Sequence, residues 1–300
     1  MISEMMKAIL EQTRRQQEEA ARENAAGAQK YGVIMHQDIP YIADDTEDHM
    51  LDVILPDDTG AVRPVILVIH GGGYYTCSKL TNLPQSAYLA SCGWNAVNVN
   101  YRLQPEAGFR EEIQDLCSAL QWIGRNADTY GFDADHVMIT GDSAGGHLAL
   151  LLAAVLNDPY LQDYYGVLVN EVRVRAAAVS CPAGSLETFS RATDPVGTLC
   201  RTVLSFQLKE EDWDYVSIDR IIRRGTFPEV MILTTPTDDL LYKHTKCLHE
   251  AFLRAQVPHI YREFTGDAPL GHVFNVLEPQ RAESIAANGE ILDYFAIHIA

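Results

Sequence analysis

Short apolar runs alternate with longer amphipathic segments along most of this 300-residue chain. Each short run has the length and composition of a strand buried on both faces of a parallel sheet, and each longer segment has helical periodicity. We expect strands at 64–70, 95–100, 136–140, 173–179, 229–234 and 258–264, and helices near 110–128, 144–156, 242–256 and 280–297. This order predicts an α/β protein whose mostly parallel sheet has helices on both faces.

The beginning of the sheet follows a different pattern. Residues 49–55 alternate between polar and apolar side chains, and an extended segment at 33–42 precedes them. Such alternation is typical of antiparallel strands with one exposed face, so we expect an antiparallel pair at the sheet edge. A further helix is expected between the strands at 64–70 and 95–100.

A long connection, residues 182–227, interrupts the alternation. Connections of this length in a compact domain usually have a function. The segment carries five aromatic residues interleaved with charged ones: Phe189, Phe206, Trp213, Tyr215 and Phe227. Core packing would explain each aromatic side chain alone, but the whole segment favours a cap that lines a substrate pocket.

The pentapeptide Gly141-Asp142-Ser143-Ala144-Gly145 follows the expected strand at 136–140 and precedes the expected helix at 144–156. A serine on a tight strand-to-helix turn has a strained backbone and projects its hydroxyl above the sheet. The residues two before and two after it must be small, and both are glycine here. The pattern therefore predicts that Ser143 is a nucleophile.

A second motif, His70-Gly71-Gly72-Gly73-Tyr74, directly follows the expected strand at 64–70. Consecutive glycines cost conformational entropy on folding, so a loop needs a reason to carry them. Acyl-transfer chemistry gives that reason, because backbone N–H groups must closely approach a developing oxyanion. We expect the N–H groups of Gly72, Gly73 and Ala144 to form an oxyanion hole.

These motifs resemble the α/β-hydrolase family, and within it the hormone-sensitive-lipase-like esterase branch. The resemblance runs from about residue 50 to the C-terminus and includes Tyr101-Arg102-Leu103-Gln104-Pro105-Glu106. The branch usually has alanine in place of Gln104. The resemblance implies one α/β-hydrolase domain, residues 1–300, with a cap over the C-terminal ends of the strands.

Residues 1–30 form a polar pattern of helical type that, taken alone, fits a frayed tail or a partner-binding helix. In the resembled branch, N-terminal helices help to form the cap. We therefore expect residues 1–30 to belong to the cap, together with 182–227. Tyr74 and Tyr75, which follow the glycines, and Trp213 in the long connection are candidates for contact with substrate.

The histidine partner of Ser143 should follow it in the chain, after an acidic residue. Five histidines come late enough: His244, His249, His259, His272 and His298. Two of these fall in the expected helix at 242–256, one in the last expected strand, and one almost at the end of the chain. His272 alone lies in the loop between the last strand and the last helix, and Gly271-His272-Val273-Phe274 is similar to the family's H-x-F motif.

Two aspartates compete for the role of the acid. Asp238 and Asp239 both follow the strand at 229–234, where a carboxylate can accept a hydrogen bond from the imidazole and fix its tautomer. The family's D-x-L spacing aligns Asp238 with the acid and Leu240 with the leucine. We therefore favour Asp238, and we expect Asp239 to be a charge near the N-terminus of the following helix, where it would be stabilising.

Composition narrows the functional classes. The net charge is −18, which argues against partners such as nucleic acid or an anionic membrane surface. We find no segment of membrane-spanning length and no signal sequence at the N-terminus. The six cysteines lack paired spacing, which favours free thiols and a cytoplasmic location. The chemistry needs no cofactor or metal, and a homodimer is compatible with the sequence.

The sequence thus predicts a serine carboxylesterase acting on small-molecule esters, with Ser143, Asp238 and His272 as its catalytic residues. By family resemblance alone, the acyl groups are short; acetyl esters of sugars or other small alcohols are candidates. An amidase or peptidase would use the same three residues and stays open. A non-catalytic ligand-binding relative is disfavoured, because such proteins typically lose the serine or the histidine.

The choice between the two aspartates can be tested directly. Asp238→Asn should lower kcat by about 10⁴-fold, because the orienting carboxylate is lost, and Asp239→Asn should cost far less. Steady-state kinetics of both variants on one ester would measure the ranking. The reverse ranking would show that Asp239 is the acid.

Overall fold

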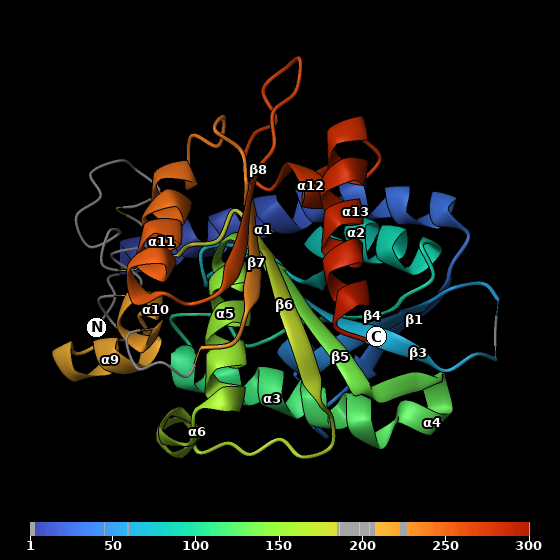
Figure 1. Cartoon of the computed structure of the whole chain (residues 1–300), viewed down its shortest axis with the longest axis horizontal. Coiled ribbons are helices and arrows are strands. Elements are labelled where there is room, and N and C mark those ends of the chain that lie inside the picture. Colours follow the sequence, from blue (N-terminus) through green and yellow to red (C-terminus); the bar gives the residue numbers. More distant parts are fainter. Residues whose placement is uncertain are drawn as a thin grey trace.

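The computed structural model describes residues 4–44, 46–58, 60–184, 186, 198, 204, 208–222 and 227–299. Its centre is a sheet in the order β1-β2-β4-β3-β5-β6-β7-β8 (Figure 1). The strands are β1 (Ile34–Pro40), β2 (Met50–Leu55), β3 (Arg63–Ile69), β4 (Asn95–Val99), β5 (Phe132–Asp142), β6 (Val174–Ser180), β7 (Val230–Thr234) and β8 (His259–Glu263). β2 is antiparallel to β1 and β4, and the other pairs are parallel. The predicted fold class is confirmed.

Helices cover both faces of the sheet because the strands are apolar on both sides. Val65, Leu67 and Ile69 of β3 belong to one core cluster, which includes residues of α3 (Phe109–Arg125), α5 (Ser143–Asn157) and α11 (Tyr242–Ala255). Ile66 and Val68 belong to the other cluster, with residues of α2 (Lys79–Ser91) and α13 (Ala282–Ile297). The two clusters hold the sheet between two layers of helices.

The residue ranges expected for the helices and strands are close to the observed ranges, with three differences. β5 continues through Asp142 and α5 begins at Ser143, so no loop residue separates them. α2 contains Pro84 and buried polar residues such as Asn82, which obscure its helical pattern in the sequence. Short helices that the apolar pattern did not indicate are α4 (Ala127–Tyr130), α6 (Pro159–Tyr165) and α12 (Phe274–Leu277).

The N-terminal segment forms a helix, α1 (Glu4–Ala25), followed by the 3₁₀ helix η1 (Ala26–Tyr31). Figure 1 shows α1 in dark blue, crossing the view behind the strands. Leu10 and Ala21 of α1 are buried, so the helix packs on the domain along one narrow face. Among the helices of the described residues, none combines the length and apolarity that a membrane crossing requires.

The long connection is described only in part: residues 182–184, 186, 198, 204, 208–222 and 227. Phe189 and Phe206 lie outside the described residues. The described part includes η3 (Glu210–Asp212), α9 (Trp213–Val216) and α10 (Ile218–Ile221). Val216, Ile218 and Ile221 are buried in the larger core cluster, so this part of the connection packs against the domain.

Candidate active site

The turn from β5 into α5 places Ser143 in an unusual backbone conformation. Its φ is +53°, a value that L-residues other than glycine seldom adopt. A Cβ atom on Gly141 would lie 2.4 Å from the carbonyl oxygen of Gly145, and one on Gly145 would lie 2.3 Å from the carbonyl oxygens of Ile69 and His70. Only glycine fits at both positions, as the sequence indicates. Such strain costs about 1–3 kcal/mol and is typical of functional sites.

The glycine loop after β3 also has positive φ values, which glycine adopts readily and which are strained at Tyr74. Gly72, Gly73 and Tyr74 have φ values of +115°, +61° and +71°. The N–H groups of Tyr75 and Thr76 donate to the carbonyl oxygen of Gly72, which closes the loop on itself. A Cβ atom on Gly72 would lie 2.0 Å from the carbonyl oxygen of Thr76, so no larger residue fits there.

His272 and Asp238 meet at the C-terminal edge of the sheet. Nδ1–H of His272 donates to Oδ2 of Asp238 at 2.9 Å, and the carboxylate is buried. The N–H groups of Leu240 and Leu241 donate to Oδ1, each at 2.9 Å. Burial alone would raise the pKa of Asp238, but the hydrogen bond and charge of His272 and these two N–H groups bring it below its usual value. The carboxylate is therefore ionised and holds the imidazole in one orientation.

Asp239, the competing aspartate, is exposed and precedes α11. In the part of the chain that the structure describes, one group of three metal-type donors lies close together: Cys181, Asp238 and His272 place ligand atoms within 4.8 Å of one another. Two of the three are already hydrogen-bonded to each other.

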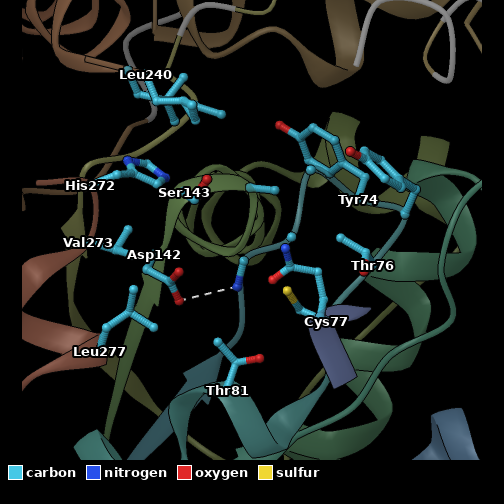
Figure 2. A pocket seen from close by; sticks show the side chains of 18 residues that line it. Tyr74, Thr76, Cys77, Thr81, Asp142, Ser143, Leu240, His272, Val273 and Leu277 are labelled. Carbon is cyan, nitrogen blue, oxygen red and sulfur yellow. Dashed lines mark hydrogen bonds between the residues drawn. The ribbon is translucent and has the colours of Figure 1, made fainter. Parts of the chain in front are cut away.

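Ser143 and His272 face a common cavity of about 300 Å³. In Figure 2 the His272 ring lies beside Ser143, with a ring nitrogen on the side of the serine. The cavity brings together seven of the nine residues predicted from the sequence: Ser143, His272, Gly72, Gly73, Ala144, Tyr74 and Tyr75. Asp238 is not among the residues that line the cavity, but it accepts a hydrogen bond from His272, which does line it. Apolar side chains supply much of the wall, including Leu240, Leu241, Val273 and Leu277.

Trp213 is not among the residues that line this cavity. It begins α9 and packs, half-buried, against the core. Tyr74 lines the cavity and also packs edge-on against Phe109 and His147, so it takes part in both the pocket and the core. Gln17 of α1 lines the cavity as well, which the sequence pattern did not reveal.

Asp142 is a second site residue that sequence reasoning missed. It is 3% exposed, and its Oδ1 accepts a hydrogen bond from the N–H of Gly71 at 3.2 Å (Figure 2). The same oxygen accepts a second hydrogen bond, from Nδ2 of Asn82 at 2.7 Å. Burial raises its pKa, and the hydrogen bond from Asn82 partly offsets that effect. Asp142 thus ties the glycine loop to the turn that carries Ser143. Its position beside the serine was the only signal in the sequence.

Comparison with known proteins shows which proteins this chain is similar to. The family model described as BD-FAE matches residues 51–190. Two proteins of Mycobacterium tuberculosis are similar: "Probable carboxylic ester hydrolase LipM", 38% identical over 46% of this chain and 32% of its own, and "Esterase LipQ", 35% identical over 47% and 34%. The crystal structure of Esterase B from Lactobacillus rhamnosis superposes with a TM-score of 0.87 at 26% identity, over 98% of this chain and 96% of the other.

The chain has the α/β-hydrolase fold, as its match to Esterase B shows. The resemblance to the hormone-sensitive-lipase-like esterase branch is confirmed by these matches. The alignment spans about a third of the length of the two mycobacterial relatives, whereas Esterase B matches along nearly its whole length. The same Esterase B has also been solved inhibited by a C4-C4 SN3 tributyrin phosphonate.

Two buried histidines lie close to the site and are hydrogen-bonded to main-chain carbonyl groups. Nδ1–H of His70 donates to the carbonyl oxygen of Gly71 at 2.7 Å, and Nε2–H of His147 donates to that of Val216 at 2.9 Å. Burial lowers the pKa of each to about 4, although each backbone hydrogen bond opposes the shift. Both imidazoles are therefore neutral in the folded hydrolase near neutral pH.

These two histidines should make the hydrolase less stable in mild acid. Each has a pKa near 6.5 when unfolded and about 4 when folded. Between these values the unfolded chain binds more protons, so the free energy of unfolding rises with pH and is lost as pH falls from 6.5 to 4. Each histidine should contribute on the order of 3 kcal/mol to this loss.

Urea unfolding at several pH values between 4 and 7 would measure the effect. His147→Gln and His70→Gln should each reduce the dependence on pH in this window, whatever they do to the stability at pH 7. A variant that retained the full wild-type dependence would show that the replaced histidine does not contribute.

Proposed function

We propose that this protein is a serine carboxylesterase that hydrolyses short-chain carboxylic esters through an acyl-enzyme intermediate. The observation that carries the proposal is the convergence on one cavity of Ser143, the glycine loop, and a histidine held by a buried aspartate. The similarity to proteins named as esterases supports the same reaction class.

In this mechanism, Oγ of Ser143 attacks the ester carbonyl while Nε2 of His272 takes its proton. Asp238, bonded to Nδ1–H of His272, stabilises the imidazolium that forms. His272 then protonates the departing alcohol. Water next attacks the acyl group on Ser143, with His272 again acting first as base and then as acid, and the carboxylic acid leaves.

The negative charge that develops on the carbonyl oxygen needs donors fixed in advance. We assign that task to the N–H groups of Gly72, Gly73 and Ala144, all of which belong to residues lining the cavity. The positive φ values of Gly72 and Gly73 are the conformational basis for turning this part of the backbone toward the substrate. Ala144 lies at the start of α5, where the helix dipole also favours negative charge.

The cavity supports small substrates. Its volume of about 300 Å³ lies at the lower end of the range for ligand pockets, and its wall is largely apolar. Acyl groups of about two to six carbons are therefore our proposed range, consistent with the phosphonate bound to the similar Esterase B. Acetyl esters of sugars or other small alcohols fall within this class. Because the five described cysteines are all free thiols, we also propose a reducing, cytoplasmic location.

Replacement of the nucleophile tests the reaction. Ser143→Ala should lower kcat by roughly 10⁴- to 10⁶-fold without unfolding the protein, because the attacking group is removed and the core is unchanged. Hydrolysis of a short-chain p-nitrophenyl ester would measure the loss. Mass spectrometry should also find a phosphonate inhibitor on Ser143 of the wild type. Near-normal turnover by the variant, or inactivating label on a different residue, would refute the assignment.

We further propose that α1 belongs to the cap of the ester site. Gln17 of α1 lines the cavity that contains Ser143, while Leu10 and Ala21 bury the same helix against the domain. The carboxamide of Gln17 adds a polar group to a mainly apolar wall. It should therefore disfavour long apolar acyl chains.

Gln17→Leu should shift the preference toward longer acyl chains. Each additional buried methylene group contributes about 0.8 kcal/mol. If the leucine side chain buries about one more methylene group of the longer chain, the ratio of kcat/KM for hexanoate to that for acetate should rise roughly two- to fivefold. A panel of p-nitrophenyl esters from acetate to octanoate would measure it. Gln16→Leu, on the exposed neighbouring position of α1, is the matched control and should retain the wild-type ratio. An unchanged ratio in Gln17→Leu would remove α1 from the proposed cap.

A further inference from the structure

The glycine loop has to hold a strained conformation without belonging to a helix or strand. Three consecutive residues, Gly72, Gly73 and Tyr74, have positive φ, and Cys77 has a φ of +68°. Strain of this kind persists only where the surrounding structure enforces it. The contacts that enforce it therefore decide where the N–H groups of the loop point.

Contacts from the domain itself reach two positions of the loop. The carboxylate of Asp142 binds the N–H of Gly71, at the beginning of the loop. The N–H of Gln104 donates to the carbonyl oxygen of Tyr74 at 2.8 Å. The next carbonyl group along the chain, that of Tyr75, is bound from α1.

Arg14 of α1 makes that contact. Its Nε donates to the carbonyl oxygen of Tyr75 at 2.7 Å, and its Nη2 donates to that of Gln104 at 2.7 Å. Nη1 and Nη2 also reach the carboxylate of Glu106, at 3.2 and 2.7 Å. One guanidinium group thus joins the glycine loop to the segment 104–106, which itself binds the loop through Gln104.

A second contact from α1 lies on the other side of the loop. Oε2 of Glu18 accepts a hydrogen bond from the hydroxyl of Ser78 at 2.9 Å, and Ser78 is the N-cap residue of α2. Arg14 and Glu18 are four residues apart, so they project from one face of α1. The helix therefore binds the loop's final residues at Tyr75 and again at Ser78.

We propose that Arg14 is a positioning residue for the oxyanion hole, through which α1 controls the rate of the chemical step as well as the shape of the cavity. The proposal rests on the esterase function above. Without Arg14, the carbonyl group of Tyr75 loses its charged donor, and the strained backbone at Tyr74 can relax and move the adjoining glycines. Displacement of catalytic groups by about 1 Å can cost 10²-fold in rate, and loss of one oxyanion donor costs 10²- to 10³-fold.

The shape of the guanidinium group makes the proposal specific. Arginine presents several N–H donors in a fixed plane, so it can bind two carbonyl groups and a carboxylate at once. Lysine keeps the charge and can still pair with Glu106, but its three donors radiate from one nitrogen and cannot reproduce the planar contacts with both carbonyl groups. Arg14→Lys therefore separates the geometric role from simple attraction between α1 and Glu106.

Steady-state kinetics on p-nitrophenyl butyrate test the proposal. Arg14→Ala and Arg14→Lys should each lower kcat by about 10- to 100-fold with little change in KM, because the loss arises mainly in the transition state. The affinity for a trifluoromethyl ketone, whose hemiketal oxyanion occupies the hole, should fall in parallel with kcat/KM. Glu106→Gln should lower kcat less than Arg14→Lys does, since both carbonyl contacts of Arg14 remain.

Arg15→Ala is the matched control. Arg15 is the adjacent, exposed arginine, and the ion pair that it makes among the described residues is with Glu11, within α1. The Arg15→Ala variant should keep the wild-type kcat and the wild-type affinity for the trifluoromethyl ketone. Thermal unfolding of each variant shows whether the domain is folded. In a second experiment, guanidinium ion at tens of millimolar should partly restore the kcat of Arg14→Ala, whereas NaCl at the same concentration should not.

Three results would overturn the proposal. Arg14→Lys with wild-type kcat would show that charge alone suffices. A raised KM with unchanged kcat would limit α1 to a wall of the cavity. Unchanged ketone affinity would show that the oxyanion hole is intact. If instead the wild type failed to hydrolyse any ester, the esterase assignment itself would fail, an outcome that the wild-type and Ser143→Ala measurements distinguish.

Discussion

The close approach of β3, β5 and α5 is the constraint on which the rest of the site depends. Gly145 lies so near the carbonyl oxygens of Ile69 and His70 that even one methyl group would collide with them. This contact fixes the nucleophile turn against the end of the strand from which the glycine loop emerges. Asp142 then binds the loop's first N–H group. The nucleophile turn and the beginning of the loop therefore share one rigid origin, whereas the contact of Arg14 acts further along the loop, at Tyr75.

The other half of the site comes from the opposite side of Ser143. Asp238 follows β7, and His272 lies in the connection between β8 and α12. Because these strands are parallel to β5, their C-terminal ends reach the same edge of the sheet as Ser143. Three hydrogen bonds hold the pair: two backbone N–H groups donate to Oδ1 of Asp238, and the imidazole donates to Oδ2. A parallel sheet thus assembles residues that are almost 130 positions apart.

Much of this arrangement could be predicted because it has local signatures. Buried strands are recognisable in the sequence as apolar runs. The glycines at 141 and 145 indicate a turn in which no larger residue fits. The pairing of His272 with Asp238 followed from chain order and motif spacing. The first and last residues of α2 could not be predicted, because Pro84 and several polar side chains interrupt its apolar pattern. These polar side chains are buried against other parts of the domain.

Contacts between distant segments could not be predicted. Asn82 and Asp142 are 60 residues apart, and Arg14 and Gln104 are 90 residues apart. Nothing in either partner's surroundings in the sequence indicates the other. Trp213 illustrates the converse case, since an aromatic residue in a long connection suggested a pocket wall, whereas the residue packs against the core outside the cavity.

The hydrogen bond between His147 and Val216 has a consequence for how this domain can diversify. His147 lies one turn after Ser143 on α5, and it binds the main-chain carbonyl of Val216 in the long connection. A carbonyl oxygen is present whatever side chain occupies the position. The side chain at position 216 can therefore change while this contact between α5 and the connection is retained. The helix that carries the nucleophile is in this sense insulated from substitutions at the position to which it is hydrogen-bonded, because the bond is blind to residue identity on one side.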